Sequence, residues 1–131
     1  MDVAPGATAE VEVTVTPDRT AEAMGNRGVP VLSTPHVIGL LENAAHRVLA
    51  PHLPPGAGTV GTRVEVRHLA PTPVGMRVRA RATLLERDGR RFLFAVEAWD
   101  EREKVAEGRH ERVVVPDLAG FLARAAAKAG A

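Results

Sequence analysis

Glu42 lies inside an apolar helical pattern, a setting in which a carboxylate can do chemistry. Ile38 lies four residues before it and Ala45 three residues after it, so all three share one face of a helix. A carboxylate at the border of an apolar face is partly desolvated, and such groups serve as bases or nucleophiles. The structural alternative is a glutamate at the rim of the helix that simply reaches water.

His68 and Thr34 add an imidazole and a hydroxyl to this carboxylate. His68 alternates in register with Val64 and Val66, so we expect it to point toward the core, where a structural histidine is the alternative. Thr34 and Pro35 are typical of a helix N-cap and a first helical position. Because the amides at a helix start favour developing negative charge, the set suits acyl transfer, although spacing alone does not identify it.

The remaining motifs point away from other chemistries. Residues 56–61 match Gly-x-Gly-x-x-Gly, but a Pro-Pro turn precedes them and a strand pattern follows, so we interpret them as a loop. The chain has no Cys, and Ser33 is its only serine and lies in no Gly-x-Ser-x-Gly setting. The five histidines show no metal-ligand spacing, so we expect no structural metal.

Length, composition and charge restrict the class of protein. The 131 residues form one domain over residues 1–131, and the 45% hydrophobic and 25% charged content is that of a soluble globular protein. A net charge of +1 gives no reason to expect nucleic-acid binding. No apolar run is long enough to span a membrane, and residues 1–6 lack signal-peptide features, so we expect a cytoplasmic protein without membrane contact.

The hydrophobic periodicity predicts an α+β domain. Strands are expected at residues 9–16, 59–70, 76–85, 92–99 and 105–115, and one long helix extends from residue 34 to about residue 49. Residues 18–34 form a loop or lid with one possible helical turn at 20–24, and a short C-terminal helix turns Leu118, Phe121 and Leu122 inward. An antiparallel sheet wrapped around the central helix fits this order. Such a sheet leaves a face and an edge bare, which favours a homodimer, with a tetramer also possible.

Several runs of the sequence resemble the fluoroacetyl-CoA thioesterase family, which has a hotdog fold. The runs keep their order and spacing over residues 31–115, and they are Leu32–Ala45, Gly61–Thr62, Val66–Gly75 and Gly108–Arg112. The resemblance implies a homodimeric acyl-CoA thioesterase that needs no cofactor beyond the coenzyme A of its substrate. It implies a catalytic set of Thr34, Glu42 and His68, and a glycine, Gly61, that lets the backbone approach the substrate.

Under this resemblance Glu42 activates water or attacks the thioester carbonyl directly. The amides from His36 onward would hold the oxyanion, and His68 would orient the substrate or assist proton transfer. Two features depart from the family: Pro35 replaces a glycine, and residues 18–33 hold no aromatic side chain. The alternatives are a hotdog-fold acyl-CoA hydratase or dehydratase and a non-catalytic acyl-CoA-binding module.

Overall fold

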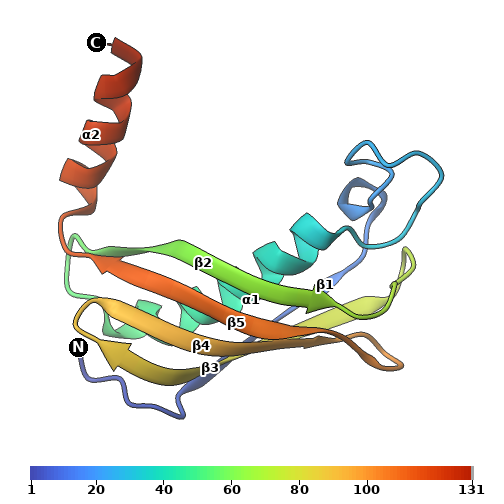
Figure 1. Cartoon of the computed structure of the whole chain (residues 1–131), viewed down its shortest axis with the longest axis horizontal. Coiled ribbons are helices and arrows are strands. Elements are labelled where there is room, and N and C mark those ends of the chain that lie inside the picture. The colour runs from blue at the N-terminus through green and yellow to red at the C-terminus, as the bar shows by residue number, and fades with distance from the viewer. Residues whose placement is uncertain (131) are drawn as a thin grey trace.

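A computed structural model, which describes residues 1–130, shows one antiparallel sheet wrapped around a long helix (Figure 1). The strands are β1 (Thr8–Thr14), β2 (Gly58–His68), β3 (Arg77–Asp88), β4 (Arg91–Trp99) and β5 (Lys104–Val115), in the order β1-β3-β4-β5-β2. The helices are α1 (Thr34–Leu49) and α2 (Leu118–Gly130), with short 3-10 turns η1 (Pro17–Arg19) and η2 (Ala50–His52). The predicted α+β arrangement is confirmed.

The core lies between α1 and the concave face of the sheet. Apolar residues recur along α1 at intervals of three and four, which gives a buried face of Val37, Leu40, Leu41, Ala44, Ala45, Val48 and Leu49. Strands β3 and β4 meet this face with alternate buried side chains, which are Val78, Ala80, Ala82, Leu84, Phe92, Phe94, Val96 and Ala98. The alanines of β3 leave room for the helix and the two phenylalanines fill the remaining space, so α1 is firmly held.

The start of α1 differs by one residue from the prediction. Ser33, not Thr34, is the N-cap, and its hydroxyl accepts a hydrogen bond from the amide of His36 at 3.1 Å. Thr34 is therefore the first helical residue and Pro35 the second, where a missing N–H costs no intrahelical bond. Because Ser33 caps the helix, the hydroxyl of Thr34 is free to bond elsewhere.

Strand β2 carries a bulge that the alternating pattern did not reveal. Gly61 pairs with Arg112 and Arg63 pairs with Glu111, so one extra residue lies between them. Strict alternation along residues 59–70 predicts that Val60 and Thr62 share the inner face with Val64, and the bulge shows that this prediction is wrong. The bulge lets Gly61 and His68, seven residues apart, face the same side of the sheet, which strict alternation would forbid.

Two other segments lie near the ends of α1 and β5. The lid, residues 20–32, is tied down by the bridges Thr20–Leu32 and Val31–Pro73, and residues 21–25 form a turn rather than a helix. No side chain of helix α2 is fully buried: Leu118 and Phe121 are half-buried, and the prediction that Leu122 points inward is wrong, because it is 55% exposed. Within residues 1–130, neither helix has the length and apolar character needed to cross a membrane.

We expect Gly108→Ala to destabilise the protein by about 1–3 kcal/mol or more. A Cβ at Gly108 would lie 2.0 Å from the carbonyl oxygen of Glu65 and 2.7 Å from the Cα of Val66, and these backbone atoms are fixed by the β2–β5 ladder. Gly39→Ala is the control: no atom lies within 4 Å of its Cβ position, and alanine is favoured inside a helix by about 0.5–1 kcal/mol. Urea unfolding measures both, and an unchanged midpoint for Gly108→Ala would contradict the register.

Candidate active site

Thr34 and His68 meet at the start of α1. The hydroxyl of Thr34 lies 2.8 Å from Nδ1 of His68, which joins the helix start to the last residue of β2. Burial lowers the pKa of His68, so its imidazole is predominantly neutral at neutral pH. Its other ring nitrogen, Nε2, is buried and has no hydrogen-bond partner among the described residues. The pair therefore presents one unused polar atom that a substrate or water can engage.

Glu42 lies further along α1, opposite the bulge of β2. Its Oε2 is 3.6 Å from Nη1 of Arg112, and the side chain is 40% exposed. A Cβ placed at Gly61 would lie 2.6 Å from the same oxygen, so any larger residue there would displace the carboxylate. The fold thus brings Glu42 and Gly61 together, and the carboxylate contacts both the Arg112 guanidinium and solvent.

Arg112 is buried and held by bonds that leave one of its nitrogens beside Glu42. Its Nε donates to the hydroxyl of Thr59 at 3.0 Å, and its Nη2 donates to the Thr59 carbonyl at 3.2 Å. Nη1 lies 3.1 Å from Nε2 of His110, whose Nδ1 lies 2.8 Å from the carbonyl of Arg63. Nδ1 must donate to that carbonyl, so Nε2 is free to accept from Arg112. The arginine cannot rotate away without breaking these bonds.

The hydroxyl of Thr59 also joins a second imidazole to this network. It lies 2.6 Å from Nδ1 of His46, which follows Glu42 by one helical turn. Burial and the nearby charge of Arg112 lower the pKa of His46, which favours a neutral ring. The sequence pattern predicted no role for Arg112, His110, Thr59 or His46. One feature of the sequence could have indicated these roles: His110 and Arg112 alternate on the inward-facing side of an apolar strand.

The amide of His36 is not free to hold an oxyanion, contrary to the expectation. It donates to the hydroxyl of Ser33, and the amide of Val37 donates to the Ser33 carbonyl at 3.0 Å. The ring of His36 is also occupied, because its Nδ1 lies 2.5 Å from the same hydroxyl. Within residues 1–130, the amide of Thr34 is the one at the helix start that lacks an acceptor.

One chain does not bring the three predicted catalytic side chains together. Thr34 and Glu42 are eight positions apart in a continuous helix, which places them about 12 Å apart along the axis. The structure instead forms two clusters, Thr34 with His68 and Glu42 with Gly61 and Arg112. Within residues 1–130, no group of three or more metal-ligating side chains converges.

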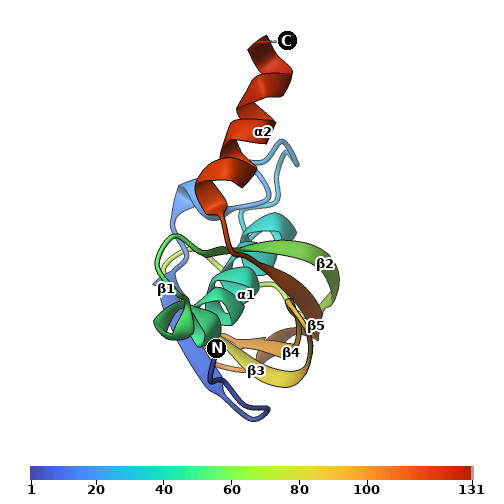
Figure 2. The same ribbon diagram turned by 90° about the vertical axis from the view of Figure 1, so that its left-hand side faces the viewer.

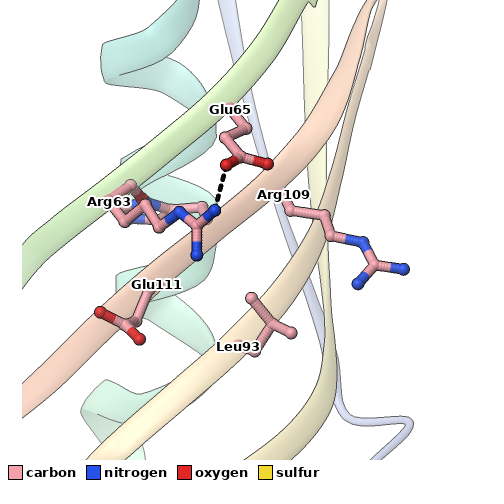
Figure 3. Close-up of a pocket in the computed structure, with 6 residues that line it drawn as sticks. Arg63, Glu65, Leu93, Arg109 and Glu111 are labelled. Carbon is pink, nitrogen blue, oxygen red and sulfur yellow. Dashed lines mark hydrogen bonds and ion pairs between the residues drawn. The ribbon is translucent and has the colours of Figure 1, made fainter.

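A hollow on the opposite face of the sheet is lined by none of Thr34, His68, Glu42, Gly61 and Arg112, although His110 contributes to its wall. It has a volume of 120 Å³, and Figure 3 shows its side chains on the outer side of β2, β4 and β5, with α1 behind the strands. Arg63 pairs there with Glu65, and Glu111 accepts a hydrogen bond from Thr62 at 2.6 Å. Because these charged groups are paired locally, we do not assign them to the active site.

Comparison with known proteins identifies the family of this chain. Residues 15–117 match the model of a family described as fluoroacetyl-CoA-specific thioesterase. The chain belongs to this family. A fluoroacetyl-CoA thioesterase from Streptantibioticus cattleyicolor is 41% identical over 85 residues, which cover 65% of this chain and 61% of that protein. The match therefore spans less than two thirds of that relative's length.

Solved structures of the fluoroacetyl-CoA-specific thioesterase family and its neighbours share the fold. The crystal structure of a fluoroacetyl-CoA thioesterase, 32% identical, superposes with a TM-score of 0.91 over 98% of both chains. A thioesterase superfamily member from Thermus thermophilus, also 32% identical, gives 0.87 over 98% of this chain and 96% of its own. A hot-dog-like protein from Thermanaerovibrio acidaminovorans, 27% identical, gives 0.86 over 98% and 97%. The predicted hotdog fold is confirmed.

Because His110 is buried and neutral, acid should weaken the fold. Burial lowers its pKa, so below the ordinary value of about 6.5 the unfolded chain binds more protons, and stability falls as pH drops. We expect the free energy of unfolding to fall between about pH 7.5 and pH 5.5, and to fall less in His110→Gln. The exposed His52 supplies the control, His52→Gln. Equal pH dependence of the two variants in urea titrations would refute this assignment.

Proposed function

We propose that this chain is an acyl-CoA thioesterase that hydrolyses a thioester to a free acid and coenzyme A. The observation that carries the proposal is the carboxylate of Glu42, which pairs with Arg112, lies close to the backbone of Gly61 and remains partly exposed. Family membership supports the proposal, as does a 32% identical relative, solved as a variant in complex with acetyl-CoA. We expect the protein to act in the cytoplasm.

In the proposed reaction Glu42 either removes a proton from the attacking water or attacks the thioester carbonyl itself. Arg112 orients this carboxylate, and the bulge at Gly61 lets the carbonyl approach it. The amide of Thr34 donates to the developing oxyanion at the start of α1. The neutral imidazole of His68, held by the Thr34 hydroxyl, orients the substrate or assists proton transfer, accepting the proton released by the attacking water and then passing it to the leaving thiolate.

The two clusters require a second copy of the chain, so we propose a homodimer with shared sites. Strand β2 is an edge of the sheet, and residues 62–65 are exposed, including the inner-face Val64. Antiparallel pairing of two β2 strands, with a two-fold axis midway between Gly61 and His68, would bring Glu42 of one copy to His68 and Thr34 of the other. A tetramer of two such dimers is compatible with this pairing.

Glu42→Gln should lower kcat by about 10²-fold or more, as expected when a general base or nucleophile is lost. The amide is isosteric, so the fold and the substrate affinity should be retained. Glu86→Gln, an exposed carboxylate on β3, is the matched control and should retain wild-type activity. A thiol-release assay with a panel of acyl-CoAs measures both variants. Wild-type rates for Glu42→Gln would refute thioester hydrolysis at this site. If the wild-type protein binds acyl-CoA tightly but leaves it unaltered, the result would favour the binding module.

We expect broad acceptance of acyl groups, because the lid contains no aromatic ring to enclose a small one. Its exposed apolar residue is Met24, and an apolar pocket separates close isosteres by only about 1–3 kcal/mol. The measurement is kcat/KM for fluoroacetyl-, acetyl-, butyryl-, hexanoyl- and phenylacetyl-CoA, with hydration of an enoyl-CoA as the test for a hydratase. A preference for fluoroacetyl over acetyl above about 10³-fold would place specificity outside the lid.

A further inference from the structure

Helix α2 has an apolar side that its own chain covers only at the start, where Leu118 lies against Gly58. Figures 1 and 2 show α2 projecting from the end of β5 beyond the β2 edge of the sheet. Leu118, Leu122, Ala125 and Ala129 recur at helical spacing along one side, and none of the side chains of α2 is buried. A 13-residue helix is marginal in water by itself, so packing against another surface is needed to hold it.

The other exposed apolar side chains mark where that surface lies. The large hydrophobic residues with high exposure are Met24, Val64, Leu69, Val74, Leu85 and Leu122. Val64 is on β2, Leu69 and Val74 follow the end of β2, and Met24 is in the lid. The lid is joined to the same connection, because Leu32 donates to the carbonyl of Thr72 at 2.9 Å. Apart from Leu85, these residues therefore lie along β2 or beyond one of its two ends.

A two-fold axis across β2 superimposes these two ends. Antiparallel self-pairing sets the Gly58 end of one strand beside the His68 end of the other. Helix α2 begins beside Gly58: the amide of Leu118 donates to the carbonyl of Gly56 at 3.0 Å, and the Leu118 side chain covers Gly58. The apolar side of α2 therefore comes to the other copy's lid and to the connection that follows its His68.

We propose that α2 of each copy packs on the lid and on the residue 69–74 connection of a second copy of this chain. The inference rests on the proposed shared site and extends it. Each site then takes Thr34, His68 and the lid from one chain, and Glu42, Gly61 and α2 from the other. The C-terminal helix of one chain closes the acyl site of its partner.

Cross-linking tests this contact, because the chain has no native cysteine. Leu122→Cys is combined in the full-length chain with Met24→Cys, Leu69→Cys or Val74→Cys, and each protein is treated with a short bis-maleimide. We expect a covalent dimer on a denaturing gel. The controls are Leu122→Cys alone and Leu122→Cys with Leu85→Cys, an exposed apolar position on β3, and both should remain monomeric on the gel.

The outcomes separate this inference from the proposed function. A mass near twice 13.9 kDa by light scattering, with no covalent dimer from any of the three pairs, would overturn the packing of α2, and so would equal cross-linking through Leu85. A mass near 13.9 kDa would also overturn the packing of α2, because the protein would then be a monomer. Thiol release would show whether that monomer still hydrolyses acyl-CoA.

A charge on the apolar side of α2 gives a second test. Leu122→Glu should raise KM for acyl-CoA severalfold and speed hydrogen exchange in the lid, where the amide of Glu22 donates to the carbonyl of Val29. Ala127→Glu places the same charge on the opposite side of α2 and should change neither quantity. Identical behaviour of the two variants would overturn the proposal.

Discussion

The rise of helix α1 along its axis determines which side chains can meet in one site. An α-helix rises about 1.5 Å per residue and cannot fold back on itself, so the eight residues from Thr34 to Glu42 keep the two side chains in separate places. The packing of α1 into the sheet makes this separation rigid, because Val37, Leu41 and Ala45 are buried against β3 and β4. In the proposed dimer, the two clusters of one site therefore come from two helices, one in each chain.

A buried arginine makes the second cluster possible. Placing a guanidinium in the core is costly unless its donors and its charge are satisfied, and Arg112 donates to Thr59 and His110 and forms an ion pair with Glu42. His110 can accept the bond from Arg112 only in its neutral form. Its burial favours that form, and its bond to the Arg63 carbonyl keeps the proton on Nδ1. The orientation of Glu42 thus depends on strands β2 and β5, which are remote from it in sequence.

Local patterns in the sequence predicted the elements well, since period-two and period-3.6 hydrophobicity depends only on neighbouring residues. The bulge at Gly61 could not be predicted that way, because it is a property of the hydrogen bonds between β2 and β5. Ser33 and Thr34 are chemically alike, so the sequence did not distinguish which one caps α1. Arg112 was missed because its partner Thr59 lies 53 residues away. The resemblance to a family named Thr34, Glu42 and His68, but only the fold shows that one chain separates them.

Subunit complementation tests most directly whether two chains build one site. Glu42→Gln and His68→Ala chains are co-expressed with different tags and purified through both, so that each dimer holds one copy of each. One of its two sites then has every side chain intact, and the account predicts about half of the wild-type activity per dimer. Thr34→Ala paired with His68→Ala is the matched control, because both of its sites carry a lesion and should be inactive. A Glu42→Gln/His68→Ala dimer as inactive as either parent would contradict the shared site.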